Sequence, residues 1–132
     1  EKLNELCASI ANCICDKKCY KKMAVIGTEE LMYPAIYVSG KISENGYRTL
    51  CHSTTRSPIT VSTEEEYPLH TRYELRSVYD DERKTFIYDI GTYDKVVIIT
   101  DTENISDSGI QDLCKAVYSK NNIDITLVRW CD

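Results

Sequence analysis

Two stretches of the chain repeat apolar residues at the spacing of an α-helix. The first stretch carries Leu3, Leu6, Cys7, Ile10, Cys13 and Ile14. At about 100° per residue these positions share one stripe, which predicts an amphipathic helix over residues 1–22. The second stretch predicts a helix over residues 107–120, with Ser106 or Asp107 as its N-terminal cap.

Other stretches have the composition or the alternating pattern of β-strands. They cover residues 35–41, 47–53, 59–61, 72–79, 84–88, 95–100 and 123–130. Asn45-Gly46 separates the first two, and this dipeptide between strand-like runs favours a β-hairpin. The polar run at 80–83 predicts a second hairpin, formed by 72–79 and 84–88.

These elements predict a single α+β domain over residues 1–132. Its parts are an N-terminal helix (1–22), antiparallel strands (35–90) and a C-terminal β-α-β unit (95–130). The two strands of that unit should be parallel, because a helix connects them. We therefore expect one mixed, mostly antiparallel sheet, with helices that cover it and close one core.

Composition narrows the classes of protein to which the chain can belong. Its 132 residues contain 16 Lys and Arg against 21 Asp and Glu, for a net charge of -5. Neutralising a nucleic-acid backbone takes a concentration of cations, so we expect no nucleic-acid partner. No apolar run reaches the ~18–20 residues of a membrane span. The chain begins at Glu1 rather than Met, which would fit the removal of a preceding leader or membrane anchor.

Cysteine is the most distinctive residue type, with seven in the chain. On one continuous helix Cys15 and Cys19 lie opposite Cys7 and Cys13, so these thiolates do not converge on one metal ion. We therefore favour disulfides over structural Zn²⁺ at these N-terminal cysteines, and buried free thiols and zinc are the alternatives. The disulfide candidates are Cys7, Cys13, Cys15, Cys19, Cys51 and Cys131. Cys114 lies on the apolar face of the second helix, where we expect a core thiol.

Tyrosine almost replaces phenylalanine, with ten Tyr against one Phe. A tyrosine has a broad apolar face and a polar tip, which suits half-exposed strands and protein interfaces. Those in or beside predicted strands are Tyr33, Tyr37, Tyr47, Tyr73, Tyr79 and Tyr88. They predict a tyrosine-rich sheet face that binds a partner. The alternative is that they are ordinary half-buried strand residues.

A cysteine and an arginine enclose a short polar segment in Cys51-His52-Ser53-Thr54-Thr55-Arg56. This segment resembles the phosphate loop of cysteine phosphatases, in which a thiolate and an arginine flank a cradle of backbone amides. That loop has five residues between its cysteine and arginine and leads from a strand into a helix. Here four residues intervene and a further strand is expected, so we do not predict phosphatase activity.

Three acids follow the apolar run 95–100: Asp101, Glu103 and Asp107. The carboxyl end of a strand in an open α/β sheet is a common ligand site, and carboxylates there can hold Mg²⁺. This spacing makes an intracellular metal-dependent phosphodiesterase or nuclease the alternative function. The other interpretation is that these are solvated loop acids, with Asp107 in a helix cap.

The leading hypothesis is a non-enzymatic module that binds a protein partner or assembles with itself. It rests on the abundant cysteines, the tyrosine-rich strands and the lack of an intact catalytic motif. Disulfide bracing would place the module outside the cytoplasm, so we expect an exported or secreted protein with no cofactor.

Overall fold

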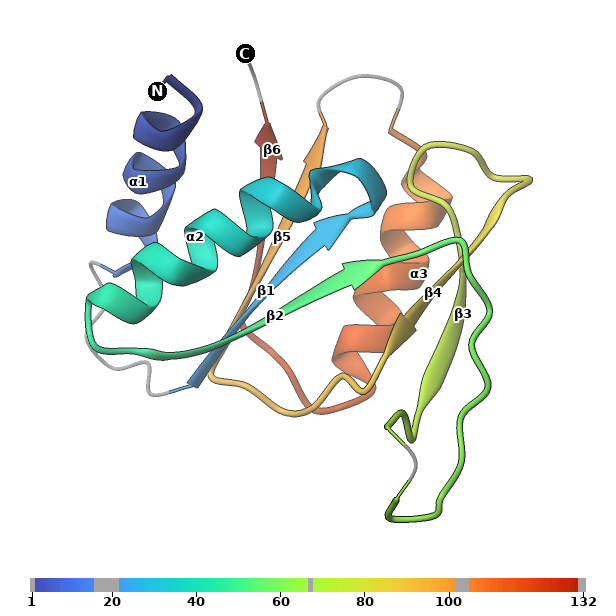
Figure 1. The fold of residues 1–132 in the computed structure, drawn as a ribbon. Helices are drawn as coiled ribbons and strands as arrows, with labels where there is room; N and C mark the ends of the chain where they lie inside the picture. The colour runs from blue at the N-terminus through green and yellow to red at the C-terminus, as the bar shows by residue number, and fades with distance from the viewer. Residues whose placement is uncertain (1, 16–21, 67, 102–104, 131–132) are drawn as a thin grey trace.

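The computed structural model describes residues 2–15, 22–66, 68–101 and 105–130 (Figure 1). Its elements in chain order are α1 (Lys2–Cys15), β1 (Lys22–Thr28), the 3-10 helix η1 (Glu29–Leu31), α2 (Met32–Glu44), β2 (Arg48–Thr54), β3 (Arg72–Arg76), β4 (Lys84–Tyr88), β5 (Lys95–Asp101), α3 (Asp107–Tyr118) and β6 (Ile125–Trp130). None of the described helices is long and apolar enough to cross a membrane.

Four of the strands form one parallel sheet in the order β2-β1-β5-β6. The two central strands, β1 and β5, are buried along almost their whole length, as expected for strands covered on both faces. The other two strands, β3 and β4, pair with each other as an antiparallel hairpin. A single β-bridge between Thr55 and Phe86 connects this hairpin to the end of β2.

The parallel sheet buries a different cluster of apolar side chains on each face. Met23 and Val25 of β1 face α1 and α2, and Val97 and Ile99 of β5 join them. The alternate residues of the same two strands face α3 and the β3–β4 hairpin. The alternation follows from the period of two in a strand, which turns successive side chains to opposite faces. Figure 1 shows the resulting layers, with α2 crossing one side of the sheet and α3 on the other.

The chain leaves the two central strands in opposite directions. From β1 it passes through α2 to the edge strand β2, and from β5 it passes through α3 to the opposite edge strand β6. The reversal point therefore lies between β1 and β5. In open parallel sheets, ligands bind at the carboxyl ends of the strands near such a point.

The structure confirms several predicted elements. The β3–β4 hairpin, the helix α3 capped by Ser106 and the parallel pairing of β5 with β6 all agree with the sequence pattern. Residues 59–61, expected as a strand, instead lie in the connection between β2 and β3.

The expected single, mostly antiparallel sheet is wrong. The main sheet is wholly parallel. The described antiparallel pairing lies in the separate β3–β4 hairpin and in the Thr55–Phe86 bridge, and two core clusters replace the single expected core.

The predicted strand at 35–41 is wrong, because this segment belongs to the helix α2. Its buried residues include Ala35, Val38, Ser39 and Ile42, which recur at helical spacing and face the sheet. The Asn45-Gly46 pair ends this helix rather than turning a hairpin: Gly46 has a φ of +91°, the left-handed conformation common just after a helix.

The predicted helix over 1–22 is also partly wrong. The described helix α1 ends at Cys15, and residues 22–28 form β1, a central strand that the sequence interpretation missed. The run Met-Ala-Val-Ile-Gly is short and wholly buried, so it lacks the alternation by which half-exposed strands are recognised. Residues 16–21 lie outside the described residues.

Candidate functional site

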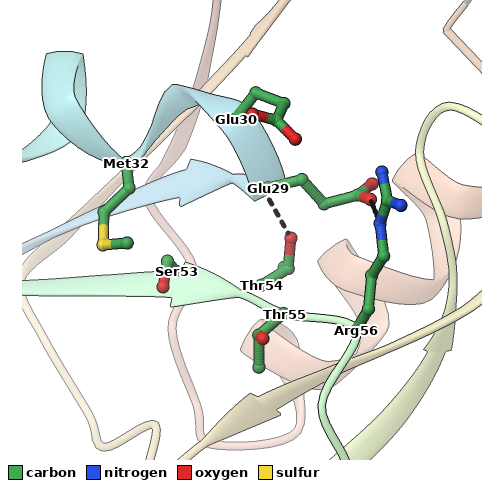
Figure 2. Close-up of a pocket in the computed structure, with 7 residues that line it drawn as sticks. All are labelled: Glu29, Glu30, Met32, Ser53, Thr54, Thr55 and Arg56. Carbon is green, nitrogen blue, oxygen red and sulfur yellow. Dashed lines mark hydrogen bonds and ion pairs between the residues drawn. The ribbon is translucent and has the colours of Figure 1, made fainter.

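A pocket of about 360 Å³ lies at the carboxyl ends of β1 and β2. We call it the strand-end pocket, and Figure 2 shows its lining residues: Glu29, Glu30, Met32, Ser53, Thr54, Thr55 and Arg56. They come from two segments, the turn from β1 into α2 and the end of β2 with the residues that follow it. The parallel pairing of β1 with β2 brings these two segments together, since it places both carboxyl ends at one edge.

The turn from β1 into α2 is unusually tight. A Cβ on Gly27 would lie 2.4 Å from the Leu31 carbonyl oxygen and 2.8 Å from Ala35 Cβ, so only glycine lets the helix approach the strand this closely. Glu29 then takes a φ of +49°, a left-handed conformation that costs energy for a residue with a side chain. Its backbone N–H donates to Thr54 Oγ1 of β2 at 3.1 Å, which joins the turn to the neighbouring strand.

The Glu29 side chain is only 3% exposed and accepts hydrogen bonds from three other residues. Arg83 Nη2 donates to Oε1 at 2.8 Å, Arg56 Nε donates to the same oxygen at 3.1 Å, and Ser77 Oγ donates to Oε2 at 2.6 Å. Buried carboxylates need such partners because desolvation penalises an unpaired charge. One carboxylate therefore holds together the turn after β1, the segment after β2 and the β3–β4 hairpin.

Arg56 is the cation that the strand-end pocket presents to solvent. Its side chain is 57% exposed, and its Nε is committed to Glu29. Among the described residues, neither Nη group of Arg56 has a hydrogen-bond partner. Thr54 projects from β2 toward Glu29, and Thr55 projects to the opposite side of the strand (Figure 2). The pocket thus combines hydroxyl groups with a partly engaged guanidinium.

Tyr79 occupies the reversal point between β1 and β5. Its hydroxyl lies 2.6 Å from Thr28 Oγ1 at the end of β1 and accepts the backbone N–H of Asp101 at 3.1 Å. Thr28 Oγ1 in turn donates to the Ile99 carbonyl at 3.1 Å. These bonds bridge the two central strand ends, so the open pocket lies one strand further along, between β1 and β2.

The cysteines predicted to form disulfides do not form a described bridge. Cys7 and Cys51 are free thiols in the structure, and Cys114 is a free, partly buried thiol on α3. Burial raises the pKa of the Cys7 and Cys114 thiols, which disfavours the thiolate that metal binding and nucleophilic attack require. The other candidates have side chains outside the described residues: Cys13, Cys15, Cys19 and Cys131.

The tyrosines expected on one sheet face are dispersed. Tyr33 and Tyr37 lie on the helix α2, with ring centroids 6.3 Å apart, so their assignment to a strand is wrong. Tyr73 and Tyr88 lie on the hairpin, and their registers place them on opposite faces. Tyr47 precedes β2, and Tyr79 follows β3.

The predicted acidic site is only partly described. Asp101 ends β5 and Asp107 begins α3, both exposed, while Glu103 lies outside the described residues. Within the described ranges no group of three or more His, Cys, Asp or Glu side chains is arranged to hold a metal ion.

Glu29 and Arg83, which organise the site, were not among the residues singled out from the sequence. Arg56 was noted only for its distance from Cys51. The sequence signal for this site is the pair Glu29-Glu30 directly after a buried apolar run. It indicates acids at the carboxyl end of a strand only if residues 22–28 are recognised as a strand.

Comparison with known proteins yields one match. A family model described as "TRSP domain C terminus to PRTase_2" matches residues 1–117. No curated protein and no solved structure matches the chain. The residues Thr55-Arg56-Ser57-Pro58 carry the one-letter codes T, R, S and P, in the order of the family's name, and the first two line the strand-end pocket.

Proposed function

The chain belongs to the TRSP domain family, and on that premise we propose that it is a non-catalytic binding module that serves a phosphoribosyltransferase. The module binds a small polar molecule in the strand-end pocket. The family description sets the TRSP domain C-terminal to PRTase_2, and PRTase abbreviates phosphoribosyltransferase. A binding module linked to an enzyme raises the local concentration of what it binds. A substrate or a product of phosphoribosyl transfer is therefore the class of ligand to test first.

The observation that carries the proposal is the arrangement of Glu29. Its backbone adopts a left-handed conformation and its carboxylate is buried among two arginines and a serine, directly beside an open pocket. Strained backbone and buried charge both cost stability, and such costs concentrate at ligand sites. The position of the pocket at the carboxyl edge of a parallel sheet supports the same interpretation.

The chemistry of the same groups supports binding without catalysis. The Glu29 carboxylate already accepts three hydrogen bonds, which leaves it poorly placed to take a proton from a ligand. His52 places Nε2 2.9 Å from the Tyr93 hydroxyl, and burial lowers the pKa of its imidazole. Both groups are thus engaged in structural contacts.

The test is a titration of the protein with ribose 5-phosphate and, separately, with 5-phosphoribosyl 1-diphosphate, followed by backbone amide NMR shifts. We expect shifts centred on residues 29–30 and 53–56, and their loss in Arg56→Gln. Arg48→Gln is the matched control, because Arg48 is an exposed arginine at the opposite end of the same strand. Absence of shifts with both probes, or shifts centred on other surfaces, would contradict the proposal.

Protein binding by the outer face of α2 is a second candidate function. Met32, Tyr33 and Ile36 are 48%, 55% and 53% exposed, which is a high exposure for large apolar side chains on one helix. These three exposed side chains support binding of a protein partner or of a second copy of the chain. Ile36→Lys should then abolish any concentration-dependent increase in mass seen by sedimentation, whereas Lys41→Glu at the far end of α2 should not.

Disulfide bracing and export stay part of this second proposal. Intact mass with and without reductant, after alkylation, counts the bridges directly. Seven freely alkylated thiols in native material would remove the proposal of a disulfide-braced, exported module.

The alternative function is metal-dependent phosphodiester cleavage. Of the two acids proposed for it that the structure describes, Asp101 and Asp107, only Asp101 supports it, because that residue ends a central strand. Unchanged Mg²⁺-dependent hydrolysis in Asp101→Asn would remove that alternative.

A further inference from the structure

We infer that the ligand of the strand-end pocket is a phosphorylated pentose with a free vicinal diol, its phosphate bound at Arg56 and its diol bound at Glu30. This inference rests on the proposed function and names the ligand class that the same site would take. It follows from how hydrogen-bond donors, acceptors and apolar surface are divided between the two segments that line the pocket.

The segment from β2 supplies donors. Both Nη groups of Arg56 have no partner among the described residues, and a guanidinium matches the geometry of phosphate oxygens with two parallel N–H bonds. The Ser53 hydroxyl likewise has no described partner, and Thr55 Oγ1 accepts only the Ser57 N–H, at 3.3 Å, which leaves its proton to donate. A phosphate group, which offers several acceptor oxygens, fits the two free Nη groups of Arg56. The Thr55 side chain points to the other side of β2 from the Arg56 guanidinium (Figure 2), so its hydroxyl is not assigned to the same phosphate.

The positive charge at the pocket lies on the Arg56 side. The Glu29 carboxylate is shared by Arg56 and Arg83, so these three side chains carry one surplus positive charge, which the Glu30 carboxylate in the other segment of the lining balances. Met32, the first residue of α2, lines the pocket, and the positive end of the helix dipole there favours negative charge.

The segment from η1 supplies an acceptor. Glu30 is exposed, lines the pocket and has no partner among the described residues. A carboxylate with two free oxygens accepts hydrogen bonds from two adjacent hydroxyl groups, which is how acidic residues bind the ribose of dinucleotides. Repulsion between Glu30 and a phosphate is avoided when the phosphate lies at Arg56 and the sugar hydroxyls lie at Glu30. The ligand must then carry both groups.

The volume of the pocket and the exposed side chain of Met32 agree with a ligand of the size of one sugar phosphate. A volume of about 360 Å³ lies near the lower end of the ~300–1,000 Å³ range of small-molecule sites, which favours one sugar phosphate over a dinucleotide. The Met32 side chain, 48% exposed, offers an apolar surface on which the carbon face of a pentose ring can pack.

The experiment compares ribose 5-phosphate, 2-deoxyribose 5-phosphate and inorganic phosphate by isothermal titration calorimetry on the intact chain. Ribose 5-phosphate should bind most tightly, and removal of the 2-hydroxyl should weaken binding about tenfold, the effect of one hydrogen bond to a charged group. Glu30→Gln should weaken binding of ribose 5-phosphate by a similar factor, because an amide keeps only one acceptor oxygen. The same variant should leave the affinity for inorganic phosphate unchanged or raise it, since it removes a repelling charge.

Arg56→Gln should weaken binding of all three probes. Glu44 is an exposed acid at the opposite end of α2, so the control Glu44→Gln should weaken binding of none of them. Equal affinity for the ribose and 2-deoxyribose phosphates, or an equal loss for ribose 5-phosphate and inorganic phosphate in Glu30→Gln, overturns the assignment of the diol to Glu30. Those results would leave the proposed binding function intact. Lack of binding by every probe would instead count against the proposed function itself.

Discussion

Glu29 is the residue on which the local structure of the site depends most. Replacing it by Gln removes the charge that pairs with Arg56 and Arg83 while keeping the size of the side chain. Breaking a buried ion pair in this way leaves an uncompensated charge and typically costs several kcal/mol. Because Arg56 is 57% exposed, we expect a smaller loss in the free energy of unfolding, of about 2–3 kcal/mol, measured by urea denaturation.

The matched control for Glu29→Gln is Glu74→Gln. Glu74 pairs with Lys84 at 3.7 Å on the hairpin, and both side chains are largely exposed. Surface pairs of this kind contribute about 0–1 kcal/mol, so the control should unfold close to the wild type. Equal stability of the two variants would mean that the Glu29 cluster does not hold the three segments together.

Asp112 makes stability depend on pH in the acid range. Hydrogen bonds from the Arg76 guanidinium lower the pKa of the Asp112 carboxyl from 3.8 to about 2, and the Arg76 backbone N–H adds a further bond. Since the folded-state pKa is depressed, the stabilisation is present above pH 3.8 and is lost as the pH falls toward about 2. Asp112→Asn should therefore show a smaller loss of unfolding free energy across this window than the wild type does.

Urea titrations between about pH 5 and about pH 2 measure this slope. Glu65→Gln is the control, because Glu65 is exposed and has no partner among the described residues. A slope in Asp112→Asn as steep as in the wild type would show that the Arg76 bonds do not set the acid sensitivity.

At the scale of elements, the closeness of β1 and α2 determines the shape of the strand-end pocket. A methyl group on Gly27 would meet the Leu31 carbonyl and Ala35 Cβ, so Gly27→Ala must push α2 away from the sheet. We expect a loss of about 2 kcal/mol in unfolding free energy, as in other overpacked sites, together with weaker binding of ribose 5-phosphate.

Gly40 provides the contrasting substitution in the same helix. No atom lies within 4 Å of a Cβ built there, so Gly40→Ala should raise the unfolding free energy by about 1 kcal/mol, the difference in helix propensity. Thermal and urea denaturation compare the two variants. Similar effects at both positions would contradict the tight approach seen at Gly27.

The elements that sequence patterns predicted correctly are those whose signal is local. The β3–β4 hairpin has alternating residues around a polar turn, and α3 has an apolar face behind a serine cap. In α2 the local signals conflicted, because Tyr33, Ile36 and Val38 favour strands by composition while the spacing of the buried residues is helical. Packing of that spaced face against the sheet decided in favour of the helix.

At the scale of the whole molecule, one central strand supports both core clusters. Ile98 and Ile99 are neighbours on β5, both 0% exposed, and they face opposite sides of the sheet. Truncating either to Ala should lower the unfolding free energy by about 3 kcal/mol. If the chain folds as a single domain, each variant should also unfold in one transition by circular dichroism and by tyrosine fluorescence.

Ile59→Ala is the control for these truncations. Ile59 lies in the connection after β2 and is 43% exposed, so its truncation should change the unfolding free energy by less than about 0.5 kcal/mol. Two separate transitions in Ile98→Ala or Ile99→Ala would mean that the two faces of the sheet unfold independently.

Neighbouring residues along the chain were sufficient to predict the hairpin, the last helix and the parallel β-α-β unit, because periodicity, caps and turns act over a few positions. They did not predict the order of the strands or the candidate site. Arg56 and Arg83 lie 27 and 54 positions from Glu29 along the chain, and only the parallel pairing of β1 and β2 and the docking of the hairpin bring them to one carboxylate. Apolar burial drives that assembly, and since it is not directional, an apolar pattern shows which faces are buried without showing which faces meet.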